Sequence, residues 1–256
     1  MGLDEALLLL RIEDKVEDTF RFYSFFPSCA SIGYFQRLSS SINLDYCFKN
    51  NIDYVRRITG GGNVFHDYMG EITYSIVLSE KKSPDNILDS FEFIYGGIIK
   101  GLKNMDINVE FKPLNDLTFN SKKISGSAQT RKNGIILQHG TLMFNTNIEL
   151  MEKVLRISNQ KTEIRKRVTT LSREGYNIGK KELIKNNVYN EVKRFTKQST
   201  IRVKKSVDKY DKDISNKEKF VKLGTTIKNE IIEIRNFSET LQLKSNNKKN
   251  IKKKGE

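Results

Sequence analysis

The chain has 256 residues, 37% of them hydrophobic, which is enough for one well-packed core and a small appendage. Its net charge of +14 is unevenly placed: residues 1–157 carry 18 Lys and Arg against 19 Asp and Glu, whereas residues 158–256 carry 27 against 12. We therefore expect a neutral folded domain first, followed by a basic partner surface or solvated tail. The two cysteines, Cys29 and Cys47, are too few for a disulfide framework or a zinc site, so reduced thiols are expected.

A short apolar run, Leu7 to Leu10, stands between Glu5 and Arg11. It is too short to span a membrane, and no basic leader precedes it. We therefore expect a cytoplasmic protein with neither a signal peptide nor a membrane partner.

Hydrophobic periodicity predicts strands in groups, with helices inserted between them. The helix at residues 85–103 has the clearest pattern, because its apolar side chains recur at helical spacing. Residues 52–55 and 72–78 alternate as strands do, with β-branched and aromatic side chains. The pattern predicts an α+β domain. Further helices are expected at 2–13, 43–50 (capped by Asn43) and 149–155 (capped by Asn147), and further strands at 20–26, 28–33, 107–111, 117–119, 123–129 and 134–145.

The composition changes after residue 157. Residues 161–167 are densely basic and have no apolar stripe, so an exposed loop is expected there. Beyond them, the pattern predicts a helix at 180–197, a strand at 201–207 and a weaker helix at 217–234. We divide the chain into a domain at 1–175, a small basic extension at 176–243 and a disordered Lys/Asn-rich tail at 244–256.

The most informative stretch is Arg56-Arg57-Ile58-Thr59-Gly60-Gly61-Gly62-Asn63-Val64-Phe65-His66-Asp67, between two expected strands. Three consecutive glycines exceed what a generic turn requires, and without Cβ atoms their N–H groups can approach an anion closely. The two arginines add planar, bidentate donors suited to phosphate or carboxylate. A cradle for such a ligand is one interpretation. A flexible hairpin flanked by surface arginines is the other, and spacing alone leaves both open.

A second segment, Lys122-Lys123-Ile124-Ser125-Gly126-Ser127-Ala128-Gln129, is a predicted strand of small residues, which lets a ligand approach the backbone. Strict alternation would put Lys123, Ser125 and Ser127 on one face, as a wall with one cation and two hydroxyls. An exposed edge strand with a solvated lysine is the alternative.

The order of the motifs resembles the lipoate–protein ligase A family. The chain combines the arginine–glycine motif, Asn115-Asp116-Leu117, the lysine segment and Gln138-His139-Gly140-Thr141-Leu142. Smaller matches at residues 3–7, 31–36 and 167–171 extend the resemblance over about residues 2–175. It implies the catalytic fold shared with biotin protein ligases, a mixed β-sheet flanked by helices, followed here by a small basic extension.

The resemblance also implies a reaction. Lipoate would be activated with ATP and Mg²⁺ to lipoyl-AMP and passed to a lysine of apo lipoyl-domain proteins, the E2 subunits of 2-oxoacid dehydrogenases and the glycine cleavage H protein. Lys123 would be catalytic, contacting nucleotide and acyl carbonyl, and Asp116 is the candidate metal ligand. The resemblance assigns adenylate binding to Arg57, Gly60, Gly61, Gly62, Asn63, Val64, Phe65 and Lys123, and lipoate binding to Lys123, His139 and Gly33.

Two other functions stay open. An octanoyl or lipoyl transferase of the same superfamily, acting from a carrier protein, would need a thiolate near the lysine strand. No cysteine follows Cys47, which favours the ligase. The basic C-terminal region also allows a nucleic-acid-binding protein, but its lysines accompany asparagine rather than aromatic residues, which favours a solvated face or a surface that steers an acidic acceptor.

Two further expectations concern the site and its partners. His66 and His139 are interpreted as hydrogen-bonding wall residues rather than general bases. The region after residue 175 is too short and too polar for the accessory domain of single-chain ligases, so a separate small accessory subunit is expected.

Overall fold

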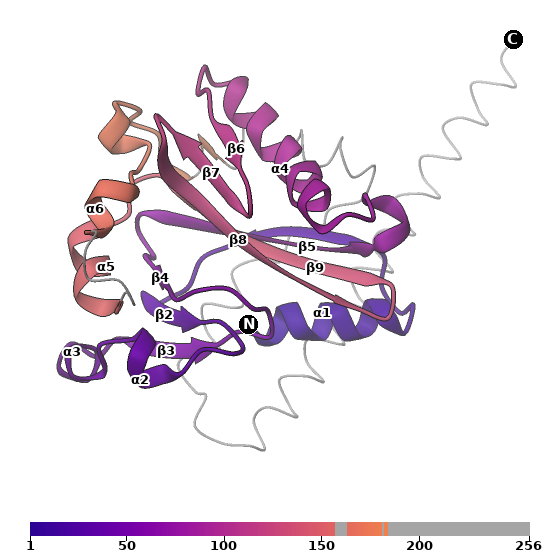
Figure 1. Cartoon of the computed structure of the whole chain (residues 1–256), viewed down its shortest axis with the longest axis horizontal. Helices are drawn as coiled ribbons and strands as arrows, with labels where there is room; N and C mark the ends of the chain where they lie inside the picture. The colour runs from indigo at the N-terminus through magenta and orange to yellow at the C-terminus, as the bar shows by residue number, and fades with distance from the viewer. Residues whose placement is uncertain (157–162, 181, 184–256) are drawn as a thin grey trace, which may run out of the picture.

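The computed structural model describes residues 1–156, 163–180 and 182–183 (Figure 1). The expected strand at 201–207, the helix at 217–234, the tail and almost all of the helix at 180–197 lie outside these residues. The division at residues 175 and 243 therefore stays a prediction. Within the described residues, no helix is both long enough and apolar enough to cross a membrane.

A six-stranded sheet with antiparallel neighbours forms the centre of the molecule. Two neighbouring strands, Glu71–Ser79 and Ile135–Met143, are buried along almost their whole length, as expected for strands covered on both faces. The strand order is β1 (Thr19–Tyr23), β5 (Glu71–Ser79), β9 (Ile135–Met143), β8 (Lys122–Lys132), β7 (Asp116–Phe119) and β6 (Glu110–Lys112).

Alternation along β5 explains the two covered faces. Tyr74, Ile76 and Leu78 pack with helix α4 (Ile87–Lys103), whose first turn is capped by the Asn86 side chain. Val77 faces the other way and packs with α1 (Gly2–Ile12). Figure 1 accordingly shows α4 on one side of the large sheet, and α1 together with a smaller sheet on the other.

The smaller sheet has three strands in the order β3-β2-β4, with β2 parallel to β3 and antiparallel to β4. Its buried residues share a core with the short helices around it, in which Ile32, Phe65 and Ile148 are almost fully enclosed. The strands are β2 (Cys29–Ile32), β3 (Asp53–Arg56) and β4 (Val64–His66), and the helices are α2 (Leu38–Ser41), α3 (Leu44–Lys49), α5 (Ile148–Val154) and α6 (Ile164–Arg167); 3₁₀ turns lie at Glu80–Lys82 and Ser172–Glu174.

The α+β class and the sheet flanked by helices are confirmed. Two local predictions are wrong. The glycine stretch connects β3 to β4, a strand that the sequence pattern did not separate from the loop. Residues 164–167 form α6 instead of a wholly exposed loop, because one apolar side chain, Ile164, is buried in the core of the smaller sheet.

Candidate functional site

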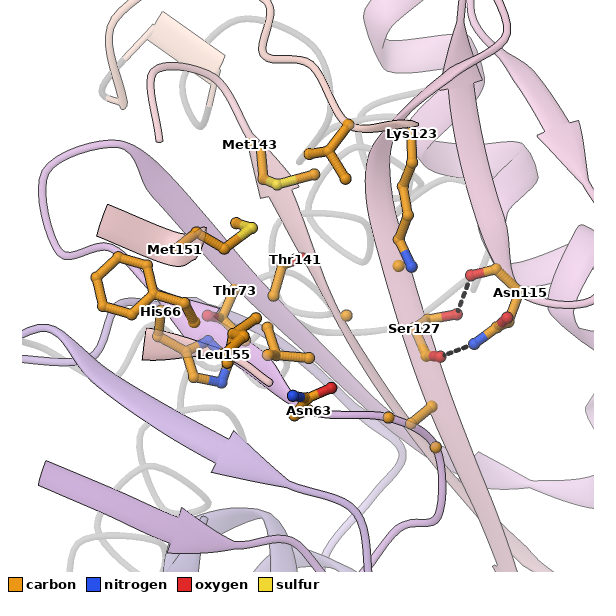
Figure 2. A pocket seen from close by; sticks show the side chains of 18 of the residues that line it. Asn63, His66, Thr73, Asn115, Lys123, Ser127, Thr141, Met143, Met151 and Leu155 are labelled. Atoms are coloured by element: carbon orange, nitrogen blue, oxygen red, sulfur yellow. Dashed lines mark hydrogen bonds between the residues drawn. The ribbon is translucent and has the colours of Figure 1, made fainter. Parts of the chain in front are cut away.

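A cavity of about 220 Å³ lies between the two sheets. Its walls come from the glycine loop, β4, β5, β8, β9 and the α5–α6 region. Alternation along β9 points His139, Thr141 and Met143 to the side of the large sheet that carries the cavity, away from α4. Figure 2 shows how these strands and the loop surround the space.

Arg57 is the buried cation of this cavity, with 4% of its surface exposed. One terminal nitrogen donates to the Ser31 hydroxyl at 2.8 Å, and the other to the carbonyls of Gly60 and Gly62 at 3.1 and 2.7 Å. Burial lowers the pKa of Arg57 to about 10. Among the described residues it has no carboxylate partner, so its charge faces the cavity uncompensated at close range.

Arg56, unlike Arg57, binds the backbone of the turn after β2. Its guanidinium donates to the carbonyls of Gly33, Tyr34 and Gln36 at 3.1, 2.9 and 2.7 Å, and so fastens the turn after β2. A Cβ on Gly33 would collide with the carbonyl of Gly61, so the turn supports the glycine loop by close backbone packing. Gly33 therefore lies behind the loop and not among the cavity-lining residues.

A β-bulge sets the direction of the central lysine. Ser125 pairs with Leu117, but Lys123 pairs with Thr118, so Ile124 is an extra residue in β8. Because the bulge interrupts the two-residue alternation, residues on either side of it exchange faces. The expectation that Lys123 shares a face with Ser125 and Ser127 is therefore wrong.

The bulge brings the Lys123 amine over Gly126, where a Cβ would collide with it. There it pairs with Asp116 at 2.6 Å, and the two side chains are 37% and 29% exposed. Ser125 and Ser127 keep to one face of β8: the Ser125 hydroxyl lies 3.3 Å from the Tyr95 hydroxyl, and the Ser127 hydroxyl donates to the Asn115 carbonyl, which also accepts from Tyr95. The amine is thus held at the cavity by one carboxylate and by the space that the glycine leaves.

His66 is the middle of a buried hydrogen-bonded chain. Its Nε2 atom lies 2.7 Å from the Ser31 hydroxyl, and its Nδ1 atom lies 2.8 Å from a Glu71 carboxylate oxygen. The ring also stacks on Phe25 at 4.1 Å between centroids. Both ring nitrogens are occupied by protein groups.

His139 occupies a matching position on the large sheet. Its Nε2 atom lies 2.7 Å from the Thr59 hydroxyl and its Nδ1 atom 3.0 Å from Asp4, which pairs with Arg21 at 2.5 Å. Burial by itself would raise the pKa of Asp4, but Arg21 and His139 hold that pKa well below its usual range. Burial lowers the pKa of His139, so the ring is neutral near pH 7. The start of the glycine loop is thus hydrogen-bonded to both sheets: Arg57 is linked through Ser31 to His66 of the smaller sheet, and Thr59 is linked to His139 of the large sheet.

The opposite wall of the cavity is apolar. Its side chains come from the end of β9, from α5 and α6, and from the segment after α6, which pairs with β8. Figure 2 shows Met143, Met151 and Leu155 on one side of the space and Lys123 with the Asn115–Ser127 pair on the other. This wall is formed by Met143, Met151, Leu155, Ile164 and Val168.

The cavity gathers most of the residues expected from the sequence. Gly60 and Gly33 lie outside its lining, and Asp116 reaches it only through its ion pair with Lys123. Among the described residues no three His, Cys, Asp or Glu side chains come together as a metal site, so metal binding by Asp116 has no support from neighbouring ligands. The expected residues that line the cavity are Arg57, Gly61, Gly62, Asn63, Val64, Phe65, Lys123 and His139.

Sequence reasoning missed two groups of residues. The apolar wall consists of ordinary core residues that carry no motif, so only the fold could place them. The hydrogen-bond partners behind the histidines are Ser31, Glu71, Asp4 and Arg21. The sequence marks only two of them, because Ser31 and Asp4 lie in the segments 31–36 and 3–7 that resemble the family.

The fold and the cavity agree with comparisons to known proteins. A family model described as "Lipoyl protein ligase A/B catalytic domain" matches residues 1–191. The chain therefore belongs to the lipoyl protein ligase A/B catalytic-domain family, and the expected superfamily is confirmed.

Individual relatives narrow the class. Octanoyltransferase LipM of Brevibacillus brevis is 34% identical over 190 residues, covering 64% of this chain and 68% of the relative. The enzyme of the same name from Clostridioides difficile is 38% identical over 177 residues, 61% of this chain and 65% of the relative. The chain thus matches about two thirds of the length of these proteins. A bi-partite lipoate protein ligase from Thermoplasma acidophilum has a similar structure, with a TM-score of 0.68 and 25% identity over 85% of this chain and 88% of that one.

The expectation of an ATP-dependent lipoate ligase is wrong. Eight curated relatives, 32–38% identical, all carry the name octanoyltransferase. A transferase moves an acyl group that is already activated, so the expected roles of ATP, Mg²⁺ and free lipoate are wrong as well. The absence of a late cysteine was given too much weight, and the expected accessory subunit, which rested on the ligase reaction, has no support from these relatives.

Proposed function

We propose that the protein is an octanoyltransferase that moves an octanoyl group from the thioester of a carrier protein to a lysine amine of a lipoyl-domain protein. The observation that carries the proposal is a cavity that combines an apolar wall with two cations, the buried Arg57 and the Asp116-paired Lys123; a third cation, the exposed Arg167, also lines it next to Val168. An acyl thioester has the matching form, an alkyl chain that ends in a polarised carbonyl. The names of the relatives support the same assignment.

The apolar wall would hold the alkyl chain. Each buried methylene contributes about 0.8 kcal/mol, so a chain of this length gains much of its binding energy here. Two of the side chains, Met143 and Met151, are unbranched and adaptable, which suits a straight and flexible ligand.

The cations would act on the carbonyl. When an amine attacks a thioester, negative charge develops on the carbonyl oxygen, and fixed donors aimed at that oxygen lower the barrier. Lys123, held by Asp116, and Arg57, held by the loop carbonyls, are the donors that the cavity offers. The carbon–nitrogen bond forms as the carbon–sulfur bond breaks, and the proton lost by the amine balances the departing thiolate.

The transfer is proposed to be direct, without an acyl-cysteine intermediate. The sequence has two cysteines, and the structure buries both: Cys29 is 8% exposed and Cys47 1%. Neither lines the cavity. The acceptor amine would therefore attack the carrier thioester itself.

Mass spectrometry of an apo lipoyl-domain acceptor tests this function. One reaction contains octanoyl-carrier protein without nucleotide, and another contains free octanoate, ATP and Mg²⁺. We expect an octanoyl adduct only in the first. The variant Lys123→Met should transfer about 100- to 1,000-fold more slowly, because it removes an oxyanion donor. Modification that requires the free acid and ATP would contradict the proposal.

The neighbouring lysine provides the matched control. Lys122 is exposed and does not line the cavity, so Lys122→Met removes the same charge from the same strand. Its rate should stay within about twofold of the parent protein, as for a surface substitution away from the site. Equal losses in the two variants would mean that strand charge, and not the cavity lysine, matters.

A further inference from the structure

The buried charge of Arg57 raises the question of what balances it. A guanidinium taken from water is costly unless donors and charges around it are satisfied. Its close partners are neutral oxygens, the Ser31 hydroxyl and two loop carbonyls. The next carboxylate along this path is Glu71, which is 2% exposed and reached through His66.

The direction of this chain follows from the chemistry of its ends. An arginine can only donate, so the Ser31 hydroxyl accepts from Arg57, and in the order that we assign it gives its own proton to Nε2 of His66. Nε2 is then an acceptor, and Nδ1 carries the ring proton, which it donates to Glu71. In this order each donor of the chain has one acceptor, and the tautomer of His66 is the assignment to be measured.

We propose that Ser31, His66 and Glu71 form a positioning relay, which orients the Arg57 guanidinium toward the cavity while placing its balancing charge three hydrogen bonds away. This proposal deepens the transfer function above and rests on it for the role of Arg57. A carboxylate in direct contact would neutralise much of the guanidinium's field. The relay instead fixes the side chain and leaves that field directed at a carbonyl oxygen.

The second histidine shows the contrast within the same molecule. There Asp4 pairs with Arg21 directly, and the chain through His139 ends at the Thr59 hydroxyl. That network is closed and holds a loop. Both histidines line the cavity, but the His66 chain ends at Arg57, which also lines it, whereas the His139 chain ends at Thr59, which does not. Figure 2 shows His66 beside Thr73.

One oxygen of the relay has no partner. The second carboxylate oxygen of Glu71 is buried and accepts no hydrogen bond from the described residues, while the first accepts from both His66 and Thr73. A carboxylate whose role was only structural would gain from satisfying both oxygens. The arrangement fits a group that supplies charge to one side, toward Arg57.

Kinetics of two serine variants test the proposal. Ser31→Ala removes the link between Arg57 and His66. Ser90→Ala is the matched control, because Ser90 is equally buried and its hydroxyl accepts from Arg131 at 2.9 Å, far from the cavity on α4. We expect kcat to fall about 10- to 100-fold in Ser31→Ala, with little change in KM for the donor. Similar kcat values for the two variants at similar thermal stability would overturn the proposal.

Nuclear magnetic resonance of the imidazole nitrogens reads the tautomer of the parent protein without an activity assay, and Ser31→Ala assigns the signals. The chain has two histidines, so the spectrum is simple. We expect the proton of His66 to lie on Nδ1, and only one of the two Nε2 signals to shift in Ser31→Ala. An Nε2-protonated His66 would overturn the relay. If the parent protein shows no octanoyl transfer at all, the proposed function fails, yet the tautomer still decides whether the relay exists.

Discussion

Replacing Gly126 by alanine tests the placement of Lys123, the lysine that we propose to be catalytic, without substituting the lysine itself. A Cβ at this position would lie 2.5 Å from Cε of Lys123, whereas ordinary contacts of a Cβ begin at about 3.4 Å. The end of the lysine side chain must therefore move by about 1 Å, away from Asp116 and out of its place in the cavity. A displacement of about 1 Å of a catalytic group can cost about 100-fold in rate.

The free energy of unfolding of Gly126→Ala should change far less than its transfer rate. The Lys123–Asp116 pair is 37% and 29% exposed, and exposed ion pairs contribute at most about 1 kcal/mol. Alanine also restricts the unfolded chain more than glycine does, which offsets part of that loss. We therefore expect kcat for octanoyl transfer to fall by about two orders of magnitude while the free energy of unfolding changes by less than about 1 kcal/mol.

The assay is octanoyl transfer measured by mass spectrometry, alongside urea denaturation of the same preparations. Gly179→Ala is the control, since a Cβ there meets no atom within 4 Å. A Gly126→Ala variant with an unchanged rate would show that the lysine does not work from the observed position. A variant that loses rate and stability together would show that the glycine serves the fold.

Three other outcomes follow from the structure. Cys29→Ala and Cys47→Ala should each transfer octanoyl at a rate within about threefold of the parent protein, since loss of a catalytic nucleophile would cost several orders of magnitude; intact-mass spectra should also show no acyl-enzyme. Gly140→Ala should destabilise the protein by about 1–3 kcal/mol in denaturant titration, because its Cβ would lie 2.5 Å from the Tyr74 oxygen inside the core. Because burial lowers the pKa of His139 in the folded protein, the unfolded chain binds that proton at higher pH, and the free energy of unfolding decreases as pH falls below about 6.5. The slope of this free energy against pH between 7 and 5 should be smaller in His139→Gln. An equal slope would contradict the burial of a neutral ring.

The elements with strong local signals were predictable. The periodic helix at 87–103 and the alternating strand at 71–79 appear close to where the pattern put them, and Asn43 and Asn147 cap helices as expected. These features depend on local spacing and capping chemistry, which a sequence displays directly.

The geometry of the site was harder to predict from the sequence, for physical reasons. The bulge at Ile124 reverses the face of Lys123, and no residue type in that segment marks an inserted residue. The apolar wall depends on where α5 and α6 pack, and its side chains look like any core. Motif residues such as Arg57 were found because their chemistry is unusual, whereas their supporting partners became visible only when distant segments met.

The choice between ligase and transferase shows a different limit. Motif order placed the chain in the right superfamily, because the cradle and the lysine serve acyl chemistry of either kind. The branch depends on how the acyl group arrives, either as a free acid that needs ATP or as a thioester. Arg57 and Lys123 suit the carbonyl oxygen in both cases. A missing cysteine could decide the branch only if every transferase required one, and direct attack on a carrier thioester has no such requirement.

The two histidines provide the last step of the argument. Each forms a hydroxyl–imidazole–carboxylate chain, the arrangement by which a hydrolase activates a nucleophile. Here both hydroxyls, Ser31 and Thr59, have 0% of their surface exposed, and both ring nitrogens of each histidine are occupied. Neither hydroxyl can reach a substrate, so the chains hold Thr59 and Arg57 of the glycine loop in place, and we assign the reaction to the cations. The chemistry of the site therefore depends on how firmly Arg57 and Lys123 are held, and the serine and glycine variants measure this directly.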